Sequence, residues 1–90
     1  MEKKVAVVVT DRQHEALRMA VGLTLGDSAV SVFVMDRKLP SDENIDLNVE
    51  TLGDMDAKIY SNTSENADFE QMTTEAIAGA LAGYDAVIPY

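Results

Sequence analysis

Residues 4–10 read Lys-Val-Ala-Val-Val-Val-Thr, an apolar run without the polar alternation of a half-exposed strand. A strand that is apolar on both faces belongs to a sheet that is covered on both sides. Three further short apolar runs follow at residues 30–35, 57–60 and 86–88, separated by stretches that read as helices. Because strands joined by crossover helices lie parallel, the sequence predicts an α/β protein. We expect a three-layer α/β/α-type fold with a mainly parallel sheet of about four strands, formed by residues 1–90 as a single domain.

Helices are expected over residues 12–25, 42–55 and 73–82. In each stretch apolar or small residues recur at spacings of three and four, which gives each helix one buried stripe. The second helix also carries an acidic outer face. Thr10 or Asp11 is expected to cap the first helix, because short oxygen-bearing side chains before a helix accept hydrogen bonds from its free N–H groups.

The order in which the strands are added decides which faces of the sheet are covered. Right-handed crossovers that add strands in one direction only would place all the helices on one face. The opposite face would then expose a large apolar area, and such areas usually form interfaces. Since a chain of 90 residues also has a thin core, we expect a homo-oligomer. A sheet that winds in both directions would weaken this inference.

The charge balance excludes two classes of partner. Seven basic residues stand against sixteen acidic ones, so the formal net charge is −9. Nucleic acids and anionic membrane surfaces are bound mainly through lysine and arginine, so neither is an expected partner.

No apolar run approaches the ~20 residues of a membrane-spanning helix, and residues 1–4 lead into the first strand without a signal sequence. We therefore expect a cytoplasmic protein.

No cofactor and no metal site is predicted. Neither a dinucleotide-binding glycine pattern nor a P-loop follows the first strand. The acidic and amide residues of 42–50 resemble alternating calcium ligands, but Leu47 stands where such a loop needs glycine. The chain has one histidine and no cysteine, which leaves too few ligands for a typical zinc site and excludes any thiol nucleophile.

Parallel sheets place their ligand sites in the loops beyond the carboxyl ends of the strands. Three such loops hold the candidate pocket, which comprises Thr10, Asp11, Arg12, His14, Asp36, Arg37, Ser61, Asn62 and Thr63. In the first loop a helix N-terminus could bind a small anion with the help of Arg12 or His14. Capping by Asp11, with its neighbours in a solvated first turn, explains the same residues without a ligand.

The third loop, residues 61–66, is rich in hydroxyl and amide groups, which suit either a polar ligand or a tight turn. A small-molecule enzyme would use Asp11, His14 and Ser61 at the strand ends. A serine nucleophile needs a nearby base, and His14 is the sole conventional candidate. A flavodoxin-like or receiver-like module would need an acidic pair after the first strand, which the sequence lacks.

The order of elements resembles that of the DsrE/DsrF-like family, small α/β proteins that include sulfur-relay subunits. The resemblance rests on the opening strand and helix over residues 5–25, on the Val- and Phe-bearing strand over 30–36, and on Lys58-Ile59-Tyr60-Ser61-Asn62 as a strand entering its loop. It implies a three-layer fold and assembly into trimers or hexamers. In the family's sulfurtransferases it also implies a persulfide-carrying cysteine near the end of a strand. Ser61 or Asn62 looks like that position here.

One difference from the family, the lack of any cysteine, decides the functional prediction. A persulfide is carried on a thiol, and neither serine nor asparagine can replace it. The sequence therefore predicts a non-catalytic, homo-oligomeric binding or assembly subunit related to sulfur-relay proteins. Such a subunit would bind a partner protein or a small ligand at the strand-end loops. The alternative is the small-molecule enzyme that uses Asp11, His14 and Ser61.

Overall fold

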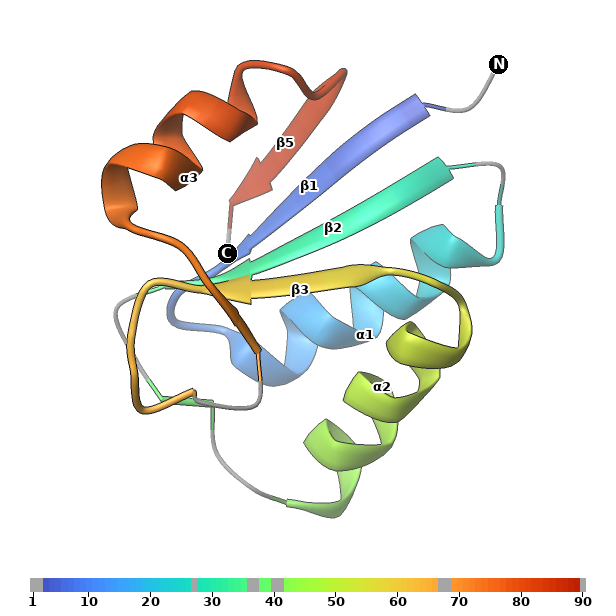
Figure 1. The fold of residues 1–90 in the computed structure, drawn as a ribbon. Coiled ribbons are helices and arrows are strands. Elements are labelled where there is room, and N and C mark those ends of the chain that lie inside the picture. The colour runs from blue at the N-terminus through green and yellow to red at the C-terminus, as the bar shows by residue number, and fades with distance from the viewer. Residues whose placement is uncertain (1–2, 27, 36–37, 40–41, 67–68, 90) are drawn as a thin grey trace.

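The computed structural model describes residues 3–26, 28–35, 38–39, 42–66 and 69–89 (Figure 1). In chain order the elements are β1 Lys3–Val9, α1 Gln13–Thr24, β2 Ser28–Val34, α2 Glu43–Asp54, β3 Lys58–Ser61, β4 Glu70–Gln71, α3 Thr74–Leu81 and β5 Ala86–Pro89. The three predicted helices are confirmed to within one residue at either end. Within these described ranges, no helix has the length and apolar character needed to traverse a membrane.

In the described part of the chain, five parallel strands form one sheet in the order β4-β3-β2-β1-β5. Strand β1 lies inside the sheet, where Val5 is in register with Val30 of β2 on one side and with Ala86 of β5 on the other. The prediction of a parallel α/β sheet is confirmed. Helices on both sides explain why the residues of β1 show no alternation between apolar and polar.

The expected number of about four strands was too low, because β4 has only two residues. Glu70 and Gln71 are polar and carry no strand pattern that the sequence alone could reveal. Contacts with β3 hold them in place. Glu70 is in register with Tyr60, and the backbone N–H of Met72 donates a hydrogen bond of 2.9 Å to the carbonyl of Ser61.

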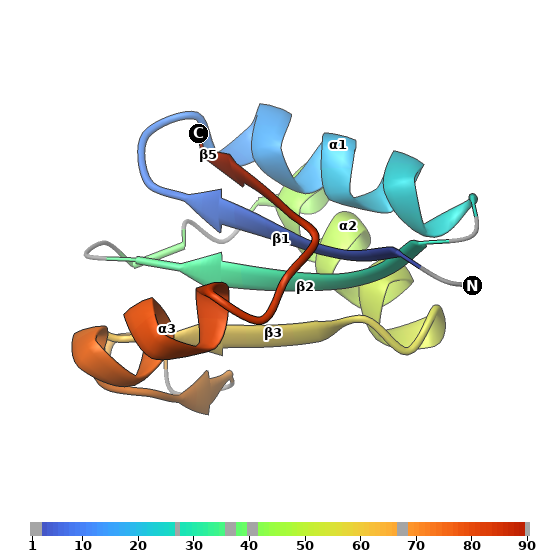
Figure 2. The same ribbon diagram turned by 90° about the horizontal axis from the view of Figure 1, so that it is seen from above.

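The sheet winds in both directions from β1. Helices α1 and α2 cover one face, whereas α3 lies on the other face, on the path from β4 to β5 (Figure 2). The result is a three-layer α/β/α arrangement. The topology with all the helices on one face is not adopted, so the argument for a homo-oligomer from a bare apolar face loses its premise.

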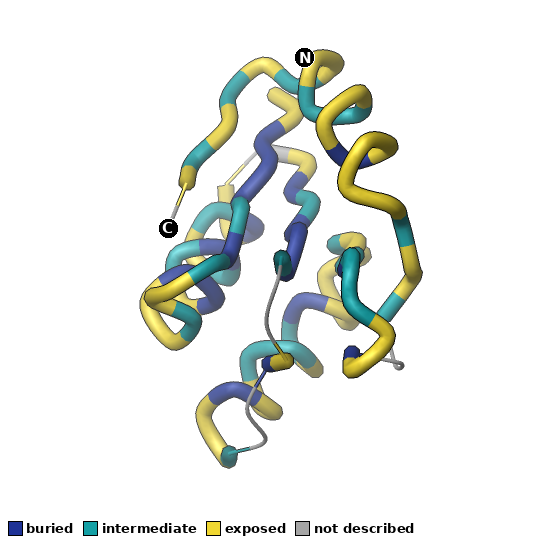
Figure 3. The backbone as a smooth tube through the Cα atoms, turned by 90° about the vertical axis from the view of Figure 1, so that its left-hand side faces the viewer, coloured by how far each residue is buried: buried dark blue, intermediate teal, exposed yellow. Residues whose placement is uncertain are grey.

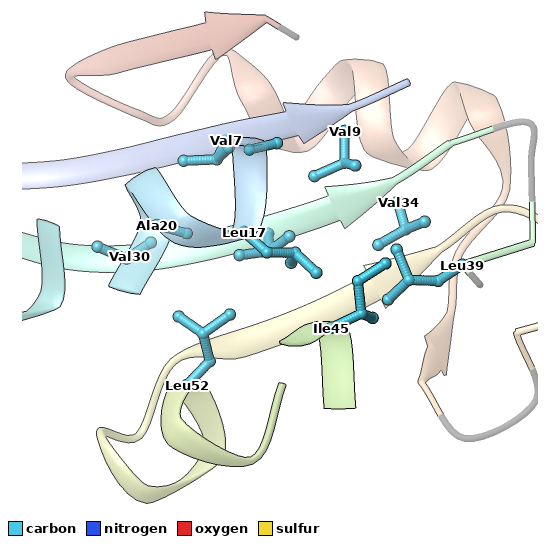
Figure 4. Close-up of a cluster of buried hydrophobic side chains, with 11 residues drawn as sticks. Val7, Val9, Leu17, Ala20, Val30, Val34, Leu39, Ile45 and Leu52 are labelled. Atoms are coloured by element: carbon cyan, nitrogen blue, oxygen red, sulfur yellow. The ribbon is translucent and has the colours of Figure 1, made fainter. Parts of the chain in front are cut away.

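The two faces of the sheet have separate cores of unequal size. The core under α1 and α2 is aliphatic (Figure 4) and comprises Val7, Val9, Ala16, Leu17, Ala20, Val30, Val32, Val34, Leu39, Ile45 and Leu52. Under α3 only Ala6, Phe33 and Ile77 form the buried cluster. Figure 3 shows the same imbalance, with burial gathered on the central strands and the inner sides of α1 and α2.

The helix caps differ from the prediction at α1. The carboxylate of Asp42 caps α2 and the hydroxyl of Thr73 caps α3, each accepting a hydrogen bond from a backbone N–H of the first turn. The N-cap residue of α1 is Arg12, and no side chain caps that helix. The prediction that Thr10 or Asp11 would cap it was wrong, because both residues precede the N-cap position from which a side chain reaches the first turn.

Candidate functional site

The segments that follow β1, β2 and β3 meet at the carboxyl ends of the strands. The side-chain amide of Gln13 donates to the carbonyl of Lys38 at 3.3 Å. The backbone N–H of Leu39 donates to Oδ1 of Asn66 at 2.8 Å. The first of these contacts joins the loops after β1 and β2, and the second joins the loops after β2 and β3. The predicted site residues Asp36 and Arg37 lie outside the described residues.

Ser61 is completely buried at the end of β3. Its Oγ accepts hydrogen bonds from Nδ2 of Asn66 at 3.0 Å and from the backbone N–H of Thr63 at 3.2 Å. Asn66, itself 6% exposed, therefore links Ser61 to Leu39 across two loops. This role of Asn66 could not be predicted from the sequence, because an asparagine in a polar loop is also what an ordinary turn contains.

Asn62 and Thr63 are half-buried and also hold the loop together. Nδ2 of Asn62 donates to the hydroxyl of Thr74 in the first turn of α3 at 3.0 Å. Oγ1 of Thr63 accepts from the backbone N–H of Glu65 at 3.3 Å. These contacts correspond to the turn interpretation of the loop, in which hydroxyl and amide groups satisfy the backbone.

The first loop shows a looser arrangement. Thr10 is half-buried and Asp11 is exposed, and both take part in interactions of their own. Arg12 lies 3.9 Å from the carboxylate of Glu15, with both side chains well exposed. An exposed ion pair of this length contributes little to stability. The Arg12 side chain is therefore not fixed in the way that a preorganised anion site requires.

His14 pairs with Asp42, which is not among the site residues predicted from the sequence. Its Nε2 lies 2.6 Å from Oδ2 of Asp42. The other carboxylate oxygen of Asp42 accepts from the backbone N–H of Ile45 at 2.8 Å. The backbone hydrogen bond from Ile45 and, after it, the contact with His14 lower the pKa of the Asp42 carboxyl. The pair joins the first turn of α1 to the N-terminus of α2.

The described residues also line grooves beyond the predicted pocket, and the first of these includes one of its residues, His14. One, of about 450 Å³, runs between α1 and α2 and is lined by His14, Glu15, Arg18, Asn44, Leu47 and Asn48. The other, of about 330 Å³, lies on the α3 face and is lined by Phe33, Tyr60, Glu70, Gln71, Met72, Ala80 and Tyr84. None of the second set was a candidate from the sequence, because no spacing along the chain brings them together.

The aromatic rings of the second groove form a continuous group. Tyr60 stacks on Phe33 with ring centroids 5.1 Å apart and an interplanar angle of 20°. Tyr84 meets Phe33 edge to face, with centroids 5.8 Å apart. Both are the offset and T-shaped geometries that aromatic pairs prefer. Phe33 is buried, whereas Tyr60 and Tyr84 are half-buried. Ligands can therefore reach the tyrosines but not the phenylalanine beneath them.

Metal binding has no evident site in the described ranges. They contain no group of three or more His, Asp or Glu side chains that could hold an ion. The acidic series of 42–50 folds as the N-cap and first turns of α2, so its side chains point outward around a helix rather than inward around a cation.

No protein-family model, no curated protein and no solved structure matches the chain. What the molecule does must therefore be argued from its own residues.

Proposed function

We propose that this chain is a non-catalytic binding and assembly subunit of the DsrE/DsrF-like kind, related to sulfur-relay proteins and lacking their persulfide cysteine. The observation that carries the proposal is the complete burial of Ser61. By the resemblance, Ser61 or Asn62 stands at the position of that cysteine. The Ser61 hydroxyl accepts two hydrogen bonds that hold the loop. A nucleophile needs access to its substrate and a base beside it.

The assembly part of the proposal is a homo-oligomer, with a trimer or hexamer expected from the resemblance. Leu25 and Leu47 support it, because these large apolar side chains are 75% and 61% exposed and a second copy could cover them. The cytoplasmic location and the existence of a partner protein stay predictions.

The alternative of a small-molecule enzyme receives less support from the geometry. Ser61 is buried, and Nε2 of His14 contacts Asp42. In the described residues the histidine therefore has an orienting carboxylate but no nucleophile beside it.

Sulfur transfer can be tested directly. The purified chain is incubated with polysulfide and then with cyanide, and thiocyanate formation and the mass of the intact protein are measured. We expect no thiocyanate above the protein-free control and no added sulfur, because no residue can hold a persulfide. Asn62→Cys is the matched positive control, since it introduces a half-buried thiol at the loop, and Ser61→Cys introduces a buried one. Turnover by the unaltered chain would contradict the proposal.

Assembly is tested by light scattering on the unaltered chain over a range of concentrations. We expect a mass of several chains, and Leu47→Lys is expected to reduce it if that side chain lies in the contact. A monomeric mass at all concentrations would remove the assembly part of the proposal and leave the non-catalytic part intact.

A further inference from the structure

The aromatic groove on the α3 face has the composition of a cation site. We propose that it binds a small organic ammonium ion, held over the ring of Tyr60 and beside the carboxylate of Glu70. The proposal concerns a ligand and does not depend on the oligomeric state. It rests on three observations: the gathering of rings, the sign of the charge at the groove, and an ammonium group that already lies against one ring.

The gathering of rings is unusual for this chain. It has five aromatic residues in all, two Phe and three Tyr, and three of them meet at this groove. The face of an aromatic ring is negative, so several rings around one space attract a cation that carries methyl or methylene groups. The sulfur-bearing side chain of Met72 and the methyl of Ala80 complete an apolar lining that suits such groups.

The charge at the groove favours a cation over an anion. Glu70 is the one charged side chain among the described residues that line it. Burial, and after it the negative charge of Glu70, raises the pKa of Tyr60, so the field of this carboxylate reaches the ring. The formal net charge of −9 adds a long-range attraction for cations.

The Tyr84 ring already has the ammonium group of Lys4 beside it, which leaves the Tyr60 side of the groove for a ligand cation. Nζ of Lys4 lies 5.2 Å from the centroid of the Tyr84 ring, within the ~6 Å range of cation–π contacts. A ligand cation would make the same kind of contact on the Tyr60 side of the groove, where Glu70 supplies the counter-charge. The volume of about 330 Å³ is near the lower end for ligand pockets, which points to a head group the size of choline.

The test compares choline with the dimethylbutanol in which a carbon atom replaces the ammonium nitrogen, so that the two ligands have the same shape but differ in charge. The NMR signals of the ligand methyl groups are followed during titration with the unaltered chain at low, constant salt. Ring currents are expected to move the choline methyl signal upfield, and choline should bind about two to five times more tightly than the isostere, as a partly exposed cation–π contact provides.

Three variants separate the contributions. Glu70→Gln should reduce the preference for choline over the isostere, whereas Glu75→Gln, an exposed change in the first turn of α3 that does not line the groove, should leave it unchanged. Tyr60→Leu should remove the upfield shift, and Tyr60→Phe should keep it. Equal affinities for choline and dimethylbutanol, or no shift with either, would overturn the proposal. So would a choline preference that is undiminished in Glu70→Gln, which retains the fold because Glu70 is exposed.

Discussion

The two faces of the sheet differ in how completely helices cover them. Two helices of 12 residues each, α1 and α2, close one face over an aliphatic core. A single helix of eight residues, α3, covers only part of the other and leaves half-buried tyrosines along a groove. The closed face supplies the stability of the fold, and the partly covered face offers the access that a ligand needs. Because the core under α1 and α2 stabilises the domain, the opposite face of the sheet can remain only partly covered.

The largest effect is expected from breaking the closed face. Leu17→Ala should lower the free energy of unfolding by about 2–5 kcal/mol, because Leu17 is completely buried between α1 and the sheet and its removal leaves a cavity. Met72→Ala, its counterpart on the open face, should cost less, since water already reaches the groove that Met72 lines. Urea denaturation measures both. An equal loss for the two variants would contradict the distinction between the faces.

An intermediate effect is expected where the strand-end loops seal the closed face. Asn66→Ala should cost about 1–3 kcal/mol, because it leaves the buried N–H of Leu39 without its partner and removes one of the two hydrogen bonds that the Ser61 hydroxyl accepts. Leu39 belongs to the aliphatic core, so this loss also loosens that core. Asn62→Ala is the matched control, since its hydrogen bond to Thr74 is exposed and its loss should be small. Equal urea midpoints for the two variants would argue against a sealing role for Asn66.

The smallest effect is expected at the contact between His14 in the first turn of α1 and Asp42, the N-cap residue of α2. Asp42→Asn keeps a good N-cap residue and removes only the negative charge that faces His14. The folded pKa of Asp42 lies below its ordinary value of 3.8, so its charge contributes stability above that value. The contribution is lost as the pH falls through the lower, folded pKa. The urea midpoint of the unaltered chain should therefore exceed that of the variant slightly at pH 6 and match it in strong acid. A difference that is independent of pH would show that the charge is not its cause.

The candidate site was predictable only in part. The meeting of the strand-end loops follows from the parallel sheet, and two hydrogen bonds, from Gln13 to Lys38 and from Leu39 to Asn66, join them. The sequence could not assign the partners within that region. His14 contacts Asp42 from 28 positions away, and Asn66 contacts Leu39 from 27 positions away. Nothing local in the chain marks either pair.

By itself, the sequence determined the parallel α/β fold, the three helices and the impossibility of thiol chemistry. Periodicity and composition are local properties, and each residue contributes to them wherever it finally lies. Only the tertiary structure decided that the sheet winds both ways, that Glu70 and Gln71 form a strand, and that Phe33, Tyr60 and Tyr84 share one groove. These features depend on contacts between distant segments, which form when the chain closes on itself and which the order of residues does not display.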